Sequence, residues 1–256
     1  MENSLPPHLL CQADWDAGRE GGAEPLGIGL LGMGVVGSGL ARVMTERGDW
    51  LAQRAGRPLA LRRVLVRDTY KRRDVHLPHR VVTDRPEEVL ADPDIHIVVE
   101  ALGGTKPARE LVLTAIEMGK HVVTANKALM AWHGREILEA AWQRGAQVRF
   151  EATVGGALWR GLAADRVTCV RGIVNGTTNY ILSRMAKEGV AIEDALREAQ
   201  RLGYAEPDPT SDVDGTDAAC KLVILCRLAF GAEIRVEEVS REGILHLAPE
   251  DFAGAE

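Results

Sequence analysis

The chain has 256 residues, of which 46% are hydrophobic and 27% are charged, which is enough for one large or two small globular domains. Its formal net charge of -6 argues against a general nucleic-acid binder, because such proteins usually carry a basic surface. No apolar run is long enough to span a membrane, and the longest, LVILCRLAF, is interrupted by Arg227.

The cysteines and the N-terminal segment indicate a cytoplasmic protein. The four cysteines have no metal-like spacing, so we expect reduced thiols at Cys11, Cys169, Cys220 and Cys226. Residues 1–25 lack the basic start and apolar core of a signal peptide. Their proline, glycine and acidic residues predict a disordered tail.

The first organised segment, LGIGLLGMGVVGSGLARVM, begins at Leu26 and reads as a strand, a glycine-rich turn and a helix start. Its G-x-G-x-x-G motif is typical of dinucleotide binding, since the glycines allow a tight turn, close approach of a pyrophosphate and close helix packing. A glycine-rich turn without a ligand is the alternative, which this context disfavours. The predicted cofactor-binding residues are Gly32, Met33, Gly34, Val35, Val36 and Gly37.

The second strand is predicted at residues 61–66, and Arg67 and Asp68 follow it directly. An acidic residue at this strand end holds the ribose 2'-hydroxyl of NAD, whereas a nearby arginine accommodates the 2'-phosphate of NADP. Lys71, Arg72 and Arg73 follow and favour NADP(H), with NAD and a simple solvated basic turn as open alternatives.

Two further strands, at residues 95–100 and 121–124, each end in a candidate binding segment. Gly103 follows the first strand, where ligands of open α/β sheets bind, and Pro107 opens the next helix. Lys127 follows the second strand, before a helix at residues 128–144, and by itself reads as an ordinary helix-start lysine. The alternation predicts a doubly wound parallel sheet of the Rossmann type over residues 26–150.

The C-terminal half, residues 151–256, contains a capping turn, an amphipathic helix and a dense acidic loop. Asn175, Gly176 and Thr177 form the turn, before a helix with Ile181, Leu182 and Met185 directed inward. The amphipathic helix spans residues 192–202 and presents the stretch GYAEPDPTSDVDGTDAACK.

In that stretch, Pro207 and Pro209 exclude a helix at first, and the apolar spacing predicts a helix from Asp212 onward. Asp217 and Lys221 are four residues apart and share one helix face. A solvated acidic loop with a surface salt pair is the alternative. The apolar continuation KLVILCRLAF argues against it and places Lys221 at the edge of a buried region.

The loop GYAEPDPTSD, the following D-x-A-x-K-L and the segment GKHVVTANK together resemble homoserine dehydrogenases. The resemblance implies NAD(P)-dependent interconversion of L-homoserine and L-aspartate 4-semialdehyde, in threonine, methionine and isoleucine biosynthesis. It also implies a Rossmann domain followed by an α+β substrate domain, whose sheet pairs across a homodimer.

The resemblance assigns roles to residues of both halves. Lys221 is the expected proton donor, oriented by Asp217. Lys127 is expected between cofactor and substrate, as a catalytic residue that stabilises charge or positions the substrate. Glu206 is expected to hold the substrate ammonium and Asp212 to order a water or the substrate. The remaining expected substrate contacts are Thr177 and Tyr204.

A monovalent cation, usually sodium, is also implied, because the segment after residue 150 resembles the E-A-x-V turn of the family. Its expected ligands, a carboxylate and backbone carbonyls, are at Glu151, Val154, Gly156 and Leu158. Oxygen ligands suit such a hard cation.

The chain departs from the family pattern in three places. Trp159 stands where the family has proline, the connection over residues 159–171 is short, and the resemblance covers residue 26 to about residue 250 without the family's later part. The alternative hypothesis is therefore a truncated, non-catalytic homologue that keeps the fold, dimerisation and nucleotide binding. A dehydrogenase for another small aldehyde is disfavoured by the complete GYAE-x-DP loop.

Overall fold

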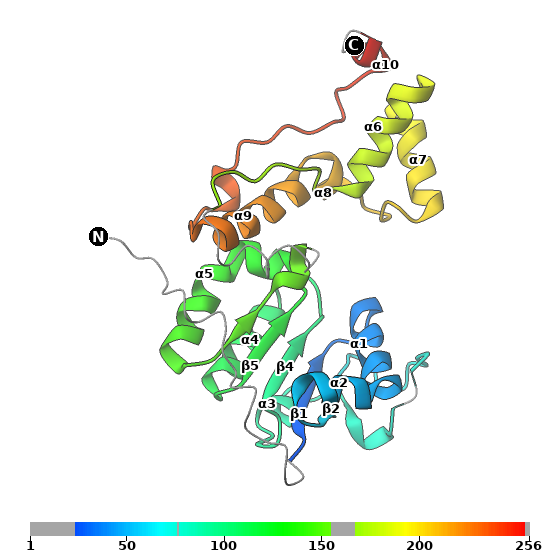
Figure 1. Cartoon of the computed structure of the whole chain (residues 1–256). Helices are drawn as coiled ribbons and strands as arrows, with labels where there is room; N and C mark the ends of the chain where they lie inside the picture. The colour runs from blue at the N-terminus through cyan, green and yellow to red at the C-terminus, as the bar shows by residue number, and fades with distance from the viewer. Residues whose placement is uncertain (1–23, 76, 155–166, 254–256) are drawn as a thin grey trace, which may run out of the picture. The chain divides into compact units, whose positions relative to one another are not determined.

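The computed structural model describes residues 24–75, 77–154 and 167–253. The chain divides into two compact units, Met1–Ala164 and Asp165–Glu256, which are described separately below (Figure 1). The division falls among residues that the structure does not describe, as do the first part of the short connection over residues 159–171 and nearly all of the predicted tail. The predicted domain boundary after residue 150 therefore stays a prediction.

A six-stranded parallel sheet, in the order β3-β2-β1-β4-β5-β6, forms the centre of the first unit. This is the strand order of a doubly wound dinucleotide-binding sheet, and it confirms the predicted fold class. The strands are β1 (Leu26–Leu31), β2 (Leu59–Leu65), β3 (Val82–Thr83), β4 (Ile97–Glu100), β5 (His121–Thr124) and β6 (Val148–Arg149).

Helices and short 3-10 turns connect these strands. Helices α1 and α2 contact each other and β2, while α4 contacts α3 and α5, so the helices form the two groups of a doubly wound fold. The connecting elements are α1 (Val35–Glu46), α2 (Gly48–Ala55), η2 (His79–Val81), α3 (Glu87–Leu90), α4 (Ala108–Glu117), α5 (Lys127–Arg144) and η3 (Glu151–Val154).

The carboxyl ends of the central strands lie in register at one edge of the sheet. Leu31 of β1 pairs with Glu100 of β4, and Glu100 pairs with Thr124 of β5. The order of the parallel strands reverses here, because β2 and β3 follow on one side of β1 whereas β4, β5 and β6 follow on the other, and ligands of open α/β sheets bind at such a point. Leu30, Ala41 and Val64 pack beneath it in the apolar core.

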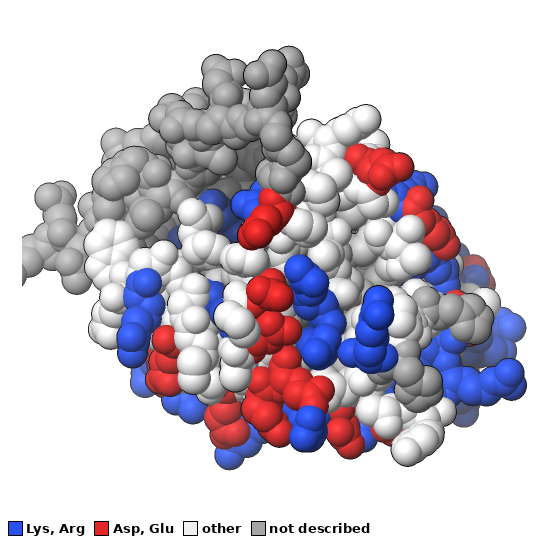
Figure 2. Space-filling view, turned by 90° about the horizontal axis from the view of Figure 1, so that it is seen from below, with Lys and Arg blue, Asp and Glu red and all other residues white. Residues whose placement is uncertain are grey.

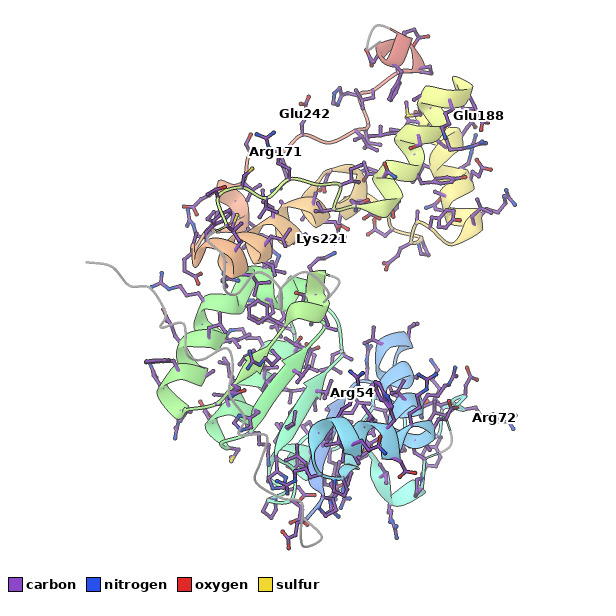
Figure 3. The ribbon with its side chains drawn as sticks, in the orientation of Figure 1. Arg54, Arg72, Arg171, Glu188, Lys221 and Glu242 are labelled. Carbon is purple, nitrogen blue, oxygen red and sulfur yellow. The ribbon has the colours of Figure 1, made fainter. Side chains whose placement is uncertain are left out.

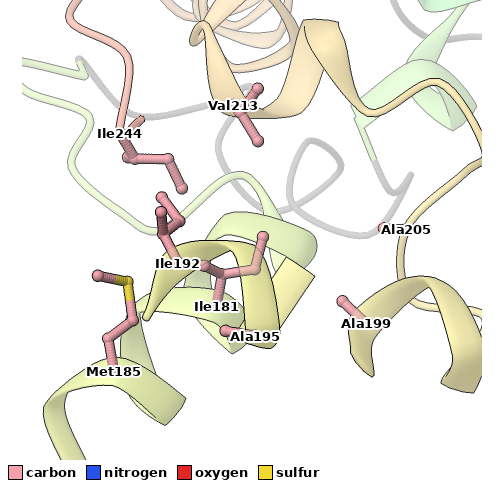
Figure 4. Packing of buried hydrophobic residues seen from close by; sticks show 8 residues of the cluster. All are labelled: Ile181, Met185, Ile192, Ala195, Ala199, Ala205, Val213 and Ile244. Atoms are coloured by element: carbon pink, nitrogen blue, oxygen red, sulfur yellow. The ribbon is translucent and has the colours of Figure 1, made fainter. Parts of the chain in front are cut away.

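The second unit is helical in its described residues. Small alanines on α7 let it approach α6 closely, and Ile181, Met185 and Ile192 fill the core between them (Figure 4). Its elements are α6 (Gly176–Glu188), α7 (Ile192–Leu202), α8 (Thr210–Val213), α9 (Thr216–Phe230), η4 (Val236–Glu238) and α10 (Pro249–Ala253).

No strand is assigned among residues 167–253, so the expected sheet of this domain, which pairs across a homodimer, stays a prediction. One expectation for this unit differs from the structure, because the helix predicted from Asp212 onward is interrupted. Gly215, at a φ of 80° that only glycine adopts readily, separates α8 from α9.

Charged side chains of both signs lie side by side on the face shown in Figure 2. The whole sequence has 31 basic and 37 acidic residues, so the slight acidic excess is spread over many charges. Among the described helices, none combines the length and apolar character needed to cross a lipid bilayer.

Candidate functional site

The glycine-rich turn between β1 and α1 has the close approaches that the sequence predicts. Gly32 has a φ of 94°, and a Cβ there would lie 2.7 Å from the carbonyl oxygen of Ala101. A Cβ on Gly37 would lie 2.1 Å from the carbonyl oxygen of Gly32. Neither position therefore tolerates a side chain without movement of the backbone.

The start of α1 is open toward a ligand. Gly34 is its N-cap residue, makes no side-chain cap and has no atom within 4 Å of a Cβ position. The first backbone N–H groups of the helix are therefore available for an anion. Val35 is 94% exposed and Val36 57% exposed beside them, so apolar surface is also available to a nucleotide.

A basic pocket of about 200 Å³ lies in the loop after β2, lined in part by Met33, Lys71, Arg72 and Arg73. The guanidinium of Arg73 donates to the backbone oxygens of Lys71 and Asp68, at 2.8 and 2.6 Å, and so holds the loop. Arg72 projects from the same loop (Figure 3).

The acidic residue of this loop holds the loop itself. A carboxylate oxygen of Asp68 accepts the backbone N–H groups of Tyr70 and Lys71, at 2.8 and 3.2 Å. The predicted Arg67 is exposed and does not line the basic pocket. The positive charge of the basic pocket thus comes from the segment Lys71–Arg73.

The loops after β4 and β5 form another part of this edge. Gly103 and Gly104 have φ values of 76° and 66° and are exposed, with open space at their Cβ positions. Asn126 is the N-cap residue of α5, accepting the backbone N–H of Leu129 at 3.1 Å. Lys127 is the half-buried first residue of that helix.

The second unit has a pocket of about 630 Å³ that collects most of the predicted substrate and catalytic residues. Asp217 is only 6% exposed, so the solvated surface pair considered for Asp217 and Lys221 does not describe it. The predicted residues that line the pocket are Thr177, Tyr204, Asp212, Asp217 and Lys221.

Asn175 links the acidic residues of this pocket. Its Nδ2 donates to Oδ1 of Asp212 at 2.7 Å and to Oδ2 of Asp217 at 2.9 Å. Its Oδ1 accepts the backbone N–H of Thr178 and so caps α6. The sequence predicts the cap but not the link, because Asp212 and Asp217 are 37 and 42 residues away.

Lys221 lies on α9 (Figure 3), and two groups contact its ammonium. Its Nζ lies 2.9 Å from Oδ2 of Asp217 and donates to the backbone oxygen of Val174 at 2.5 Å. Burial lowers the pKa of the Lys221 ammonium below its ordinary value, and the charge of Asp212 partly offsets this. An ammonium with a lowered pKa is a stronger acid than an exposed lysine.

The loop between α7 and α8 contributes one wall of the pocket. Thr177 donates its hydroxyl to the backbone oxygen of Tyr204 at 2.7 Å, and the rings of Tyr180 and Tyr204 lie 4.9 Å apart. Glu206 is exposed and does not line the pocket, so the structure does not bring it together with Lys221. Its predicted contact with a substrate ammonium stays a prediction.

The predicted sodium ligands fall only partly within the structure. Glu151 and Val154 begin and end η3, whereas Gly156 and Leu158 lie outside the described residues. Within the described ranges, no group of three or more His, Cys, Asp and Glu residues is arranged to hold a metal ion. Backbone carbonyls are part of the expected set, so the sodium site stays a prediction.

Two family models match this chain. One, described as the NAD binding domain of homoserine dehydrogenase, matches residues 32–151, and the other, described as homoserine dehydrogenase, matches residues 154–256. Homoserine dehydrogenase of Bacillus subtilis (strain 168) is 45% identical over 232 residues, which are 88% of this chain and 54% of that protein. The chain spans about half the length of the curated relatives it matches.

Solved structures agree with these matches. The structure of a putative homoserine dehydrogenase from Archaeoglobus fulgidus has a TM-score of 0.76 and 32% identity, covering 90% of this chain and 76% of that chain. A hyperthermophilic archaeal homoserine dehydrogenase in complex with NADPH has a TM-score of 0.72 and 28% identity, covering 87% and 75% of the respective chains.

Proposed function

Because this chain belongs to the homoserine dehydrogenase family, we propose that it interconverts L-homoserine and L-aspartate 4-semialdehyde with a nicotinamide nucleotide, preferably NADP(H). The observation that carries the proposal is the ion pair of the buried Asp217 with the half-buried Lys221 in the pocket of the second unit, joined to Asp212 through Asn175. The pathway of this reaction is the synthesis of threonine, methionine and isoleucine.

The nucleotide is proposed to bind at the switch point of the first unit. The open start of α1 suits a pyrophosphate, and Lys71 to Arg73 around the basic pocket suit a 2'-phosphate. Because a side-chain oxygen of Asp68 already accepts two backbone N–H groups, it is less available to a ribose hydroxyl. These features favour NADP(H) over NAD, and Gly103 and Lys127 are proposed contacts at the same edge.

The reaction needs a proton where a hydride is added to an aldehyde. The nicotinamide nucleotide, when bound, supplies or accepts that hydride. Lys221 is the proposed donor of the proton to the developing alkoxide. Its ammonium has three N–H donors, and among the described residues Asp217 and Val174 take two of them, which leaves one for the substrate oxygen.

The acidic residues of the second unit are proposed to orient the donor and the amino-acid substrate. Asp217 fixes Lys221, and Asp212 presents a carboxylate to the pocket for the substrate or an ordered water. Glu206, on the adjoining loop, is the proposed partner of the substrate ammonium, with Thr177 and Tyr204 as further contacts. A homodimer, a sodium ion at Glu151 and a cytoplasmic location complete the proposal.

Absorbance of NADPH in the presence of aspartate semialdehyde tests the proposal on the purified chain. We expect turnover by the unaltered chain and a loss of about 10²- to 10⁴-fold in Lys221→Ala, the range that a positioned acid contributes. Binding of NADPH, followed by its fluorescence, should be retained in the variant. Substantial turnover by Lys221→Ala would refute the role of this lysine.

The second candidate function is a non-catalytic homologue that still binds nucleotide, which the half-length match to curated relatives favours. It predicts a folded chain that binds NADPH and shows no turnover with aspartate semialdehyde. Turnover that depends on Lys221 would exclude it.

A further inference from the structure

Glu100 is a fully buried carboxylate at the nucleotide edge of the first unit, with 0% of its surface exposed. It is the last residue of β4 and pairs in register with Leu31, immediately before the glycine-rich turn. A buried carboxylate is costly unless its oxygens are hydrogen-bonded. The proposed function gives Glu100 no part, so its burial at this place needs a separate reason.

Both oxygens of Glu100 accept hydrogen bonds from residues of the binding edge. Oε1 accepts the backbone N–H of Leu102 at 2.8 Å and Nδ2 of Asn126 at 3.2 Å. Oε2 accepts the hydroxyl of Thr124. Among the described residues these partners are all neutral, so the carboxylate acts as an acceptor that joins two segments rather than as half of an ion pair.

The first of these segments is the loop after β4. The bond to Leu102 fixes the backbone beside Ala101, whose carbonyl oxygen lies against Gly32 of the glycine-rich turn. Nδ2 of Asn126 also donates to the backbone oxygen of Gly104 at 2.6 Å, at the far end of the loop. The loop that contains Gly103 is therefore held at both ends.

The second segment is the start of α5. The hydroxyl of Thr124 accepts the backbone N–H of Asn126 at 2.9 Å, and Asn126 caps the helix through Leu129. Lys127 follows Asn126 directly and is the first helical residue. The position of the Lys127 backbone thus depends on bonds that end at the Glu100 carboxylate.

We propose that Glu100 is a positioning residue of the nucleotide site, which fixes the loop after β4 and the start of α5 and thereby places Gly103 and Lys127. The proposal deepens the proposed function, on which the involvement of the nucleotide rests. The positioning itself rests only on the contacts within the first unit.

Hydrogen exchange of the full chain without ligand tests the positioning first. Glu100→Ala should speed exchange of the Leu102, Asn126 and Leu129 amides by about tenfold or more, because their local bonds weaken. Glu100→Gln has the same shape and keeps an oxygen acceptor, so it should preserve most of the protection. This variant still tests the positioning if Glu100→Ala folds poorly. Unchanged exchange in a folded Glu100→Ala chain would overturn the positioning.

Lys120→Met is the matched control, because it also removes a buried charged group from these strands but at their opposite end. Lys120 is 5% exposed and donates to the backbone oxygens of Asp92 and Ile95 before β4. This variant should lower stability without faster exchange at Leu102 or Leu129. Equal loosening of the loops by Lys120→Met would show that any loss of stability opens them and would overturn a specific role for Glu100.

NADPH affinity, measured by fluorescence, tests the consequence for the site. Glu100→Ala should raise the Kd about tenfold, Glu100→Gln should restore it to within about threefold, and the effect of Glu100→Ala should shrink in a Lys127→Ala background. If the effects of Glu100→Ala and Lys127→Ala on the binding free energy were fully additive, the action of Glu100 through Lys127 would be overturned. If the unaltered chain bound no NADPH while Glu100→Ala still loosened the loops, the proposed function would fail and the positioning would stand.

Discussion

Asn126 in the first unit and Asn175 in the second have the same local structure and hold different surroundings. Each caps a helix with its side-chain oxygen and donates its amide to an acidic side chain. The amide of Asn126 is divided between one buried carboxylate and a backbone oxygen. The amide of Asn175 is divided between two carboxylates, one of which holds Lys221.

The difference lies in what the acidic partner does. Glu100 has neutral partners in the described structure and stands at a strand end, so its network serves the backbone of the sheet edge. Asp217 contacts a lysine that borders a pocket, so its network serves an ionisable side chain. The same cap therefore supports geometry in one unit and acid chemistry in the other, and each residue can be altered separately.

Among changes at the two asparagines and their networks, Asn175→Ala should have the largest effect, which is on turnover. Without the shared amide, Asp212 and Asp217 lose a common donor, and the orientation of Lys221 is no longer fixed. We expect kcat for aldehyde reduction to fall about 100-fold, within the range of acid catalysis, with NADPH affinity unchanged.

Asn175→Ser separates the two duties of this side chain. Serine caps a helix about as well as asparagine but offers no amide to the carboxylates. The serine variant should therefore be nearly as stable as the unaltered chain and as inactive as Asn175→Ala. Full activity of Asn175→Ser would show that only the cap matters and would erase the contrast with Asn126.

The pH dependence of aldehyde reduction tests whether the second network serves Lys221 as an acid. Burial lowers the pKa of Lys221 from its ordinary value of 10.5, and the donor must be protonated to act. The rate should therefore be full below the lowered pKa and fall as pH rises through it, so the loss begins on the acidic side of 10.5. The measurement is kcat against pH. A kcat that falls only around the ordinary lysine pKa of 10.5 would contradict the assignment.

Asn126→Ala should act mainly on stability. It removes a helix cap, worth about 1 kcal/mol, and it removes the amide that donates to the Glu100 carboxylate and to the backbone oxygen of Gly104, at about 1 kcal/mol for each lost hydrogen bond. We expect the unfolding free energy in urea to fall by about 2 to 3 kcal/mol, with a larger loss of NADPH affinity than in Asn175→Ala. A variant with unaltered stability would show that this network is dispensable.

The smallest effect is expected at a surface pair that belongs to neither network. Arg197 and Asp194 on α7 pair across one helical turn, with side chains 74% and 59% exposed. Arg197→Ala should change the unfolding free energy by less than about 0.5 kcal/mol and leave both binding and turnover unchanged. A clear loss of turnover would extend the site along α7, beyond the pocket described above.

Much of the first unit follows from its sequence. The glycine motif, the apolar strands and Pro107 are local signals, and the structure has the turn, strands and helix start where they predict them. Strand ends differ by a few residues, as at β2 and β4, because pairing rather than apolar composition sets them. Gly215 shows the limit in the second unit, since the periodicity across it continues while the backbone turns.

By itself the sequence determined which residue types are present, where helices are capped, and that Asp217 and Lys221 share a helix face. These are properties of spacing over a few residues, which the chain fixes wherever it folds. Only the tertiary structure decided that Glu100 bridges two loops, that Asn175 joins Asp212 to Asp217, and that Glu206 stays outside the pocket. Such contacts depend on how distant segments pack, because a hydrogen bond forms only where folding brings donor and acceptor within about 3 Å.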